Sequence, residues 1–209
     1  MSPEQMRNQK LGASVVKALK SRKFDAYYVD TKQEAIDLAL SLIPSGDTVS
    51  WGGSMTIRDM GLTDAIKNAG CYTVLDRDNA APGEDIARKA LTCDTYLMST
   101  NAMSEDGQLV NIDGNGNRCA ALIFGPKSVI IVAGINKIAK TLDDAYSRAR
   151  NTAAPINQYR FNNDTPCMHT GECGDCKSDG CICANIVISR FCKPAGKVKV
   201  IIVGEKFGY

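Results

Sequence analysis

Apolar residues along the chain switch between helical spacing and short runs of β-branched residues. Leu11, Val15 and Leu19 recur at the spacing of one helix face. The run Ser128–Val132 is instead almost entirely β-branched, as expected of a strand buried on both faces. Strands are predicted at Ala26–Val29, Thr48–Trp51, Tyr72–Leu75, Thr95–Met98, Gln108–Ile112, Ser128–Val132 and Val198–Val203.

Helices are predicted between these strands. Thr31 and Glu34 form a capping-box pattern that begins one helix, and Pro44 ends it. Further helices are predicted through Ile66 to Gly70, over Ile86–Leu91, and along a face made of Ile138, Leu142, Ala145 and Ala149. This alternation indicates an α/β fold with a mostly parallel sheet flanked by helices on both faces. Because no repeat or linker interrupts it, we expect a single domain over residues 1–209 that includes a cysteine-rich loop at 162–192.

Composition narrows the class of protein. The chain has 209 residues, of which 44% are hydrophobic and 23% charged, as in ordinary globular proteins. The net charge of +2, with mixed signs, gives no reason to expect nucleic acid or a membrane surface as a partner. No apolar run is long enough to cross a bilayer. The first residues lack the pattern of a signal peptide, so we expect a cytoplasmic protein.

Polar residues follow several predicted strands, where ligands bind in parallel sheets. Gly52, Gly53, Ser54 and Thr56 follow one strand, and glycines there let the backbone approach a ligand. An ordinary strand-to-helix turn explains them equally well. Asn136 and Lys137 follow the Ser128–Val132 strand and are expected to face a carboxylate or phosphate. A helix N-terminal turn with a solvated lysine is the alternative.

A long polar stretch at 100–118 adds carboxylates, amides and an arginine. Turn chemistry accounts for Asp106-Gly107 and Asp113-Gly114. It does not require Glu105, Asn117 or Arg118, so a ligand pocket is the favoured interpretation. The candidate pocket residues in this stretch are Asn101, Glu105, Asp113, Asn117 and Arg118.

The cysteine-rich loop is the strongest signal for chemistry. Between residues 162 and 180 there are almost no apolar side chains, so the segment cannot fold by hydrophobic burial, whereas a bound metal would order it. Its cysteines are Cys167, Cys173, Cys176, Cys181 and Cys183, with Cys192 further on. Zinc sites commonly use paired two-residue spacings, and only one such pair is present, so an iron–sulfur cluster fits slightly better than structural zinc.

Other interpretations of the cysteines remain. The cytoplasm keeps thiols reduced, which disfavours a loop tied by disulfides or filled with free thiols. His169 lies inside the loop, and we expect it to be exposed or hydrogen-bonded rather than a ligand. Cys71, Cys93 and Cys119 lie in apolar or helical contexts and are expected in the core.

Motifs across nearly the whole chain carry a family resemblance. They include Asn101-Ala102, Glu105-Asp106-Gly107, Asn117-Arg118, Gly125-Pro126-Lys127, Gly134-Ile135-Asn136-Lys137, Ala153-Ala154-Pro155, Thr165-Pro166-Cys167, the run from Thr170 to Cys176, and Val203-Gly204-Glu205. These motifs resemble the LUD-type lactate utilization proteins. The resemblance implies a Rossmann-like fold of the NagB/RpiA/CoA-transferase-like kind. It also implies a role in oxidising lactate to pyruvate alongside partner proteins with iron–sulfur clusters.

The resemblance also implies a ligand set for the metal. The cysteines shared with relatives that carry the loop are Cys167, Cys173, Cys176 and Cys183. Cys181 stands where those relatives tend to have arginine, so the choice of the fourth ligand stays open.

Two functions are compatible with the sequence. The first is an accessory or electron-transfer subunit of an iron–sulfur lactate-oxidising system, as a monomer or an oligomer. The second is an enzyme acting on a small carboxylate or phosphorylated substrate, with the loop a structural zinc site. By analogy with fold relatives, Glu105 would then be the nucleophile or general base, and Arg118 and Lys137 would hold substrate anions. Backbone N–H groups of Gly53 and Ser54 would bind a phosphate or oxyanion.

Overall fold

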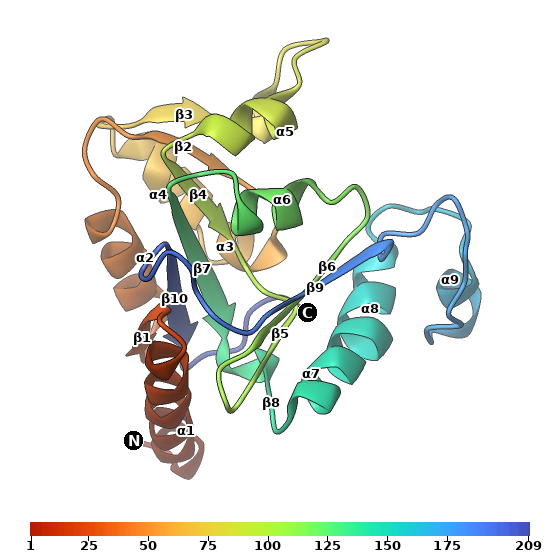
Figure 1. Cartoon of the computed structure of the whole chain (residues 1–209), viewed down its shortest axis with the longest axis horizontal. Coiled ribbons are helices and arrows are strands. Elements are labelled where there is room, and N and C mark those ends of the chain that lie inside the picture. The colour runs from red at the N-terminus through yellow and green to blue at the C-terminus, as the bar shows by residue number, and fades with distance from the viewer.

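Six parallel strands form the central sheet, in the order β1, β10, β7, β4, β2 and β3. The computed structural model describes all residues from 1 to 209 and shows helices packed against this sheet (Figure 1). The strands are β1 (Asp25–Val29), β2 (Thr48–Trp51), β3 (Thr73–Leu75), β4 (Thr95–Met98), β7 (Ser128–Gly134) and β10 (Val198–Val203). They match the strands predicted from the sequence, and the α/β class with a mostly parallel sheet is confirmed.

The central strand β7 explains why both faces of the sheet are covered. Val129 and Ile131 belong to one apolar core, whereas Ile130 and Val132 belong to a second core on the opposite face, because successive side chains of a strand point to opposite sides. The helices α1 (Pro3–Ser21) and α6 (Asn117–Ile123) pack in the first core, and α2 (Lys32–Ser41), α3 (Met55–Asp59) and α4 (Leu62–Asn68) pack in the second. The segment between β3 and β4 holds η1 (Arg77–Asn79), α5 (Ile86–Lys89) and η2 (Ala90–Thr92).

A smaller mixed sheet lies beside the first, in the order β8, β5, β6 and β9. Its strands are β5 (Ala102–Ser104), β6 (Leu109–Asp113), β8 (Ile138–Ala139) and β9 (Asn185–Ser189). The sequence pattern predicts only β6, because β5 and β8 have three and two residues, too few to show a period. A small apolar cluster that includes Ala102, Val110 and Ala149 joins this sheet to the helices that follow β8.

These helices form a single arm that begins later than predicted. Ile138 was expected on the helix face but lies in β8, and Thr141 caps the helix by accepting the Asp144 N–H at 3.1 Å. The arm runs through α7 (Leu142–Arg148), the π-helical turn η4 (Ala149–Ala153) and α8 (Ala154–Gln158). It leads to the short helix α9 (Pro166–Thr170) and the cysteine-rich loop.

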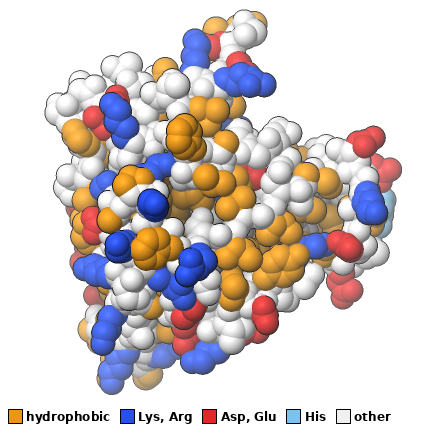
Figure 2. Space-filling model, viewed as in Figure 1, with side chains coloured by type: hydrophobic (Ala, Val, Ile, Leu, Met, Phe, Trp, Pro, Cys, Tyr) orange, Lys and Arg blue, Asp and Glu red, His pale blue; other side chains and the backbone are white.

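The α9 region projects from the body of the molecule as a lobe. Figure 2 shows charged side chains along the outer edge of this lobe and hydrophobic atoms on the neighbouring surface. None of the helices in the structure combines the length and the apolar character that a membrane crossing requires.

Burial in β7 gives a prediction for stability. Ile131 is fully buried, so Ile131→Ala should lower the free energy of unfolding by about 2–5 kcal/mol, through lost burial and the cavity left behind. The matched control is Ile123→Ala at a site 58% exposed, which should change it by less than about 0.5 kcal/mol. Urea unfolding followed by circular dichroism measures both, and equal losses would contradict the placement of β7 in the core.

Candidate functional site

A polar cavity of about 370 Å³ lies at the carboxyl ends of the central strands. Its walls come from the segments that follow β2, β3, β4 and β7, from the helical arm, and from the residues Gly208 and Tyr209. Most residues predicted for a ligand pocket line it, namely Gly53, Ser54, Thr56, Asn101, Asp113, Asn117, Arg118 and Lys137. The cavity therefore occupies the position that parallel sheets commonly use for ligands.

Lys137 lies at the floor of this cavity, in the 3-10 turn η3 (Ile135–Lys137) that follows β7. Only 5% of it is exposed. Its Nζ donates to Thr56 Oγ1 at 3.0 Å, to Ser99 Oγ at 3.1 Å and to the Thr100 carbonyl at 3.1 Å. Burial, with smaller effects from the neighbouring Arg148 and Arg118, lowers the pKa of Lys137 to about 7.

Arg118 lies beside Lys137, at the start of α6. Its Nη2 donates to Asn101 Oδ1 at 3.1 Å and to the Ile112 carbonyl, and its Nη1 reaches the Ser99 carbonyl at 3.4 Å. Ser99 therefore contacts both cationic groups, which places them next to each other.

Gly52 makes room for Arg118. A Cβ at Gly52 would lie 3.0 Å from Tyr96 Oη and 3.1 Å from Arg118 Cδ. Gly52 is thus a supporting residue behind the cavity wall rather than a lining residue. Gly53, which does line the cavity, leaves room for Arg77 in the same way, since a Cβ at Gly53 would lie 3.3 Å from Arg77 Nη1.

Positive charge dominates the cavity. Arg77, Arg118, Lys137 and Arg160 line it, against the carboxylates of Asp113 and Asp179. Asp113 Oδ2 already accepts the backbone N–H groups at the start of α6, from Arg118 at 2.8 Å and Cys119 at 3.1 Å.

A further cation, Arg148, is largely buried nearby. It donates to the carbonyls of Asn136 and Asn101, at 3.0 and 2.5 Å, and burial lowers its pKa. Neither Arg148 nor Lys137 has a carboxylate partner. Buried like charges without counter-charges are costly, so an anion entering the cavity would relieve a real electrostatic penalty.

Three predicted site residues make hydrogen bonds that do not fit their expected roles in ligand binding. Glu105 does not line the cavity: it lies at the β5–β6 turn, where its Oε2 accepts from Lys140 Nζ at 2.6 Å. The expectation that Glu105 lies in the ligand pocket is therefore corrected, and its position gives no support to a role as nucleophile or base. Asn136 holds the C-terminal segment, because it accepts the Phe207 N–H at 3.1 Å and donates to the Gly208 carbonyl at 3.2 Å. The Ser54 N–H donates to the Gly52 carbonyl at 2.8 Å, so it is not free for an anion.

Sequence reasoning missed several residues of the cavity. Ser99 and Thr100 directly follow β4, so the rule that selects strand ends would have found them. Arg160, just after the helical arm, lines the cavity, and Arg148, in the arm, lies near it. The position of the arm against the sheet leaves no local signal in the sequence.

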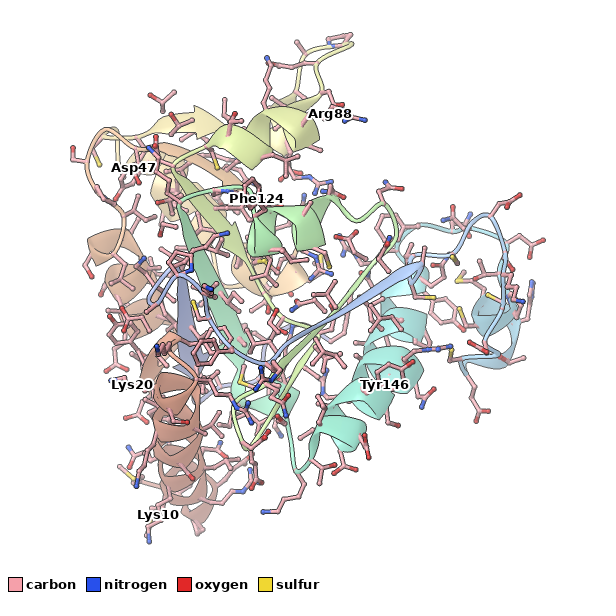
Figure 3. The ribbon with its side chains drawn as sticks, viewed as in Figure 1. Lys10, Lys20, Asp47, Arg88, Phe124 and Tyr146 are labelled. Atoms are coloured by element: carbon pink, nitrogen blue, oxygen red, sulfur yellow. The ribbon has the colours of Figure 1, made fainter.

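The cysteine-rich loop closes around a second, smaller cavity of about 20 Å³, room for about one water-sized atom. Figure 3 shows sulfur atoms gathered between α8 and the α9 loop. The cysteines that line the cavity are Cys167, Cys173, Cys176, Cys181 and Cys183. The thiols surround the space without converging, since no group of three or more Cys, His, Asp or Glu side chains is close enough to hold a metal ion.

The thiols have unequal environments. Burial, reinforced by the neighbouring cysteines, raises the pKa of Cys183 to about 11, whereas hydrogen bonding from the Ser178 backbone lowers the pKa of Cys176. Arg150, from the π-helical turn, donates to Cys173 Sγ at 3.0 Å and to Asp175 at 2.7 Å. The donor set is thus five soft sulfur atoms with one guanidinium alongside, which suits a thiolate-bound metal.

His169 and the cysteines at positions 71, 93 and 119 lie outside the thiol cavity. His169 is exposed and pairs with Asp164 at 2.7 Å, so it is no member of the cysteine group, as predicted. Cys93 and Cys119 are buried as predicted, but Cys71 is exposed, which corrects its expected place in the core. All nine cysteines are free thiols in the structure.

The two cavities share one wall. Gly180 lies against the first cavity, and Cys181 and Ile182 line both. Gln158 and Asn163 hold this wall by donating to the Gly180 carbonyl at 3.2 and 3.0 Å. The thiol cavity and the strand-end cavity are therefore separated by only a short stretch of backbone.

The fold and the two cavities together define an α/β protein with a polar strand-end cavity and an adjoining group of cysteines. A family model described as the LUD domain matches residues 13–203. The chain therefore belongs to the LUD domain family, as its motifs suggested, and this points to a function related to lactate utilization.

The fold also occurs in solved structures. One of these is a DUF162 family protein from Deinococcus radiodurans, similar with a TM-score of 0.56 and 12% sequence identity over 94% of this chain and 98% of that one. At this identity the likeness shows the fold alone. No curated protein matches the chain.

The depressed pKa of Lys137 predicts a pH dependence of stability. The folded protein binds fewer protons than the unfolded chain between about pH 7 and the ordinary lysine pKa, so stability rises with pH there. Between pH 7 and 9 the wild type should gain about 2 kcal/mol relative to Lys137→Met, which lacks the group. The control Lys140→Met, at an exposed lysine, should run parallel to the wild type. Urea unfolding across this range measures the difference, and parallel curves for Lys137→Met would show that the lysine is not perturbed.

Proposed function

We propose that the protein is a cytoplasmic subunit of an iron–sulfur lactate-oxidising system, which binds a small carboxylate in the strand-end cavity and a metal centre in the cysteine loop. The observation that carries the proposal is the shared wall at Cys181 and Ile182. It places a thiol site beside the cavity where an anionic substrate would bind. Membership of the LUD domain family favours lactate as that substrate.

The cavity supports a carboxylate ligand through its arginine. The Arg118 guanidinium is fixed by neutral oxygens of Ser99, Asn101 and Ile112. Its one carboxylate neighbour, Asp113, is 3.9 Å from Nε and already accepts two backbone N–H groups, which leaves the charge only partly compensated. Guanidinium and carboxylate groups pair with matched geometry and with charge-assisted hydrogen bonds. Ser99 and Lys137, next to Arg118, would contact the hydroxyl or carbonyl oxygen of the substrate.

The loop supports a thiolate-bound centre through its composition and its position. Four of the five thiols would suffice, and Cys167, Cys173, Cys176 and Cys183 are the proposed ligands, with Cys181 facing both cavities. When bound, an iron–sulfur cluster carries single electrons, which would pass to iron–sulfur partner proteins. Arg150 would hold the Cys173 sulfur and add positive charge next to the site.

A second candidate is an enzyme of the same fold in which the loop is a structural zinc site. The small volume of the thiol cavity, about 20 Å³, favours a single ion over a cluster. In that case the cavity around Arg118 and Lys137 would perform its chemistry without electron transfer through the loop.

Metal analysis separates the two candidates. Protein purified without oxygen should contain iron and acid-labile sulfide, and Cys176→Ser should lose both and become sensitive to protease between residues 162 and 180. The matched control is Cys71→Ser, at an exposed cysteine outside the loop, which should keep its metal. Stoichiometric zinc without sulfide would exclude the electron-transfer function and leave the second candidate.

Carboxylate binding is tested on Arg118. Arg118→Met should weaken the binding of lactate and pyruvate about tenfold or more, because a charge-assisted pair is lost. Isothermal titration calorimetry measures the affinities. Arg88→Met is the control, since Arg88 pairs with Asp85 on an exposed surface outside the cavity. Unchanged affinity in Arg118→Met would remove this residue from the site.

A further inference from the structure

The surroundings of Lys137 suit a neutral amine. A buried lysine that serves only as a fixed cation is commonly paired with a carboxylate, but Lys137 has a carbonyl and two hydroxyls instead. A neutral amine has two N–H donors and one lone pair. The Thr100 carbonyl and the Thr56 hydroxyl would accept the two N–H groups. The Ser99 hydroxyl reaches the Thr100 carbonyl at 3.4 Å, and by turning from that carbonyl it would donate to the lone pair. The same three partners thus satisfy the uncharged form.

The Thr56 hydroxyl is oriented for this arrangement. It reaches the Phe207 carbonyl at 3.4 Å, to which it can only donate, so its oxygen faces Lys137 as an acceptor. The Ser99 hydroxyl then remains as the group that exchanges a proton with Nζ. Burial lowers the pKa of Lys137 to about 7, so a substantial fraction of the amine is neutral at physiological pH.

Arg118 supplies a carboxylate partner at a short distance from this amine. Both cationic groups contact Ser99, through its carbonyl in one case and its hydroxyl in the other. A 2-oxo acid has its carboxylate bonded directly to a carbonyl carbon. With the carboxylate on Arg118, that carbon would face Lys137 Nζ from the cavity side.

We propose that Lys137 forms an imine with the carbonyl carbon of a small 2-oxo acid, of the pyruvate class, whose carboxylate is held by Arg118. The proposal rests on the carboxylate site proposed above and adds a covalent step to it.

The step requires no oxidant or reductant. The Ser99 hydroxyl turns back to the Thr100 carbonyl and frees the lone pair of Nζ, which forms a bond to the carbonyl carbon as the carbon–oxygen π bond breaks. The carbonyl oxygen takes up the proton that Nζ loses, which gives a carbinolamine. This hydroxyl then leaves as water, with a second proton from the amine, as the carbon–nitrogen double bond forms. Ser99 is the residue placed to carry both protons between nitrogen and oxygen.

The imine is tested by reductive trapping. Full-length protein purified without oxygen is incubated with pyruvate and sodium cyanoborohydride, and the intact mass and the peptide map are measured. We expect one reduced pyruvyl group per chain, located on Lys137. Lys137→Arg and Lys137→Met should give no adduct at this position. Lys140→Arg, at an exposed lysine outside the cavity, should be labelled like the wild type.

A carbonyl compound without a carboxylate tests the part played by Arg118. Methyl pyruvate, which has the same ketone but an esterified carboxyl group, should label Lys137 at least about tenfold more slowly than pyruvate at equal concentration, because the charge-assisted contact is absent. Equal rates, or labelling spread over exposed lysines, would overturn the proposed site.

Pyruvate binding is measured in parallel by saturation-transfer NMR, so that two failures can be told apart. Binding without any adduct overturns the imine and leaves the carboxylate site intact. Absence of both binding and adduct overturns the carboxylate site as well. Circular dichroism melting of the Lys137 variants shows whether they are folded, and a folded variant that is still labelled within the Lys137 peptide region would contradict the assignment.

Discussion

Burial of positive charge at the carboxyl ends of the strands is the constraint on which the rest of the site depends. Lys137, Arg118 and Arg148 come from three different segments, and nearly all their partners are neutral oxygens. The one carboxylate near them, Asp113, lies 3.9 Å from Arg118 Nε and also accepts two backbone N–H groups, so these charges keep much of their electrostatic potential. Thr56 and Ser99 are oriented by Lys137, and the C-terminal segment closes over it. The cavity is therefore prepared for an anion before any ligand enters.

The elements of the fold could be predicted from the sequence, but the grouping of charged residues at the cavity could be predicted only in part. The strands of the main sheet were predictable because their apolar runs are long enough to show a period, and Lys137 was found because it follows such a run. Glu105 was misplaced because its stretch turns back as the hairpin β5–β6, which carries it away from the strand ends. Arg148 was missed because only tertiary packing of the helical arm brings it to the Asn101 carbonyl, near the cavity. The local sequence pattern thus predicts the helices and strands, whereas the position of the charged side chains at the cavity depends on how these elements pack together.

The cysteine loop, unlike the rest of the fold, is not stabilised by a hydrophobic core. It has little apolar area to bury, and its backbone is held by a few contacts, such as those of Gln158 and Asn163 with Gly180. Binding energy from thiolates would replace the missing hydrophobic energy. The pKa values of Cys176 and Cys183 differ because the two thiols have different surroundings. Cys176 accepts hydrogen bonds from Ser178, whereas Cys183 is partly buried among other cysteines. Because Cys181 lines both cavities, ordering of the loop would also shape the wall of the strand-end cavity.

The central claim is that the strand-end cavity is an anion site centred on Arg118 and Lys137. A crystal structure of the anaerobically purified protein with lactate tests it most directly. We expect electron density for lactate with its carboxylate paired to the Arg118 guanidinium and its hydroxyl oxygen facing Lys137 and Ser99. Lactate bound elsewhere on the molecule, with this cavity filled by water alone at saturating concentration, would contradict it.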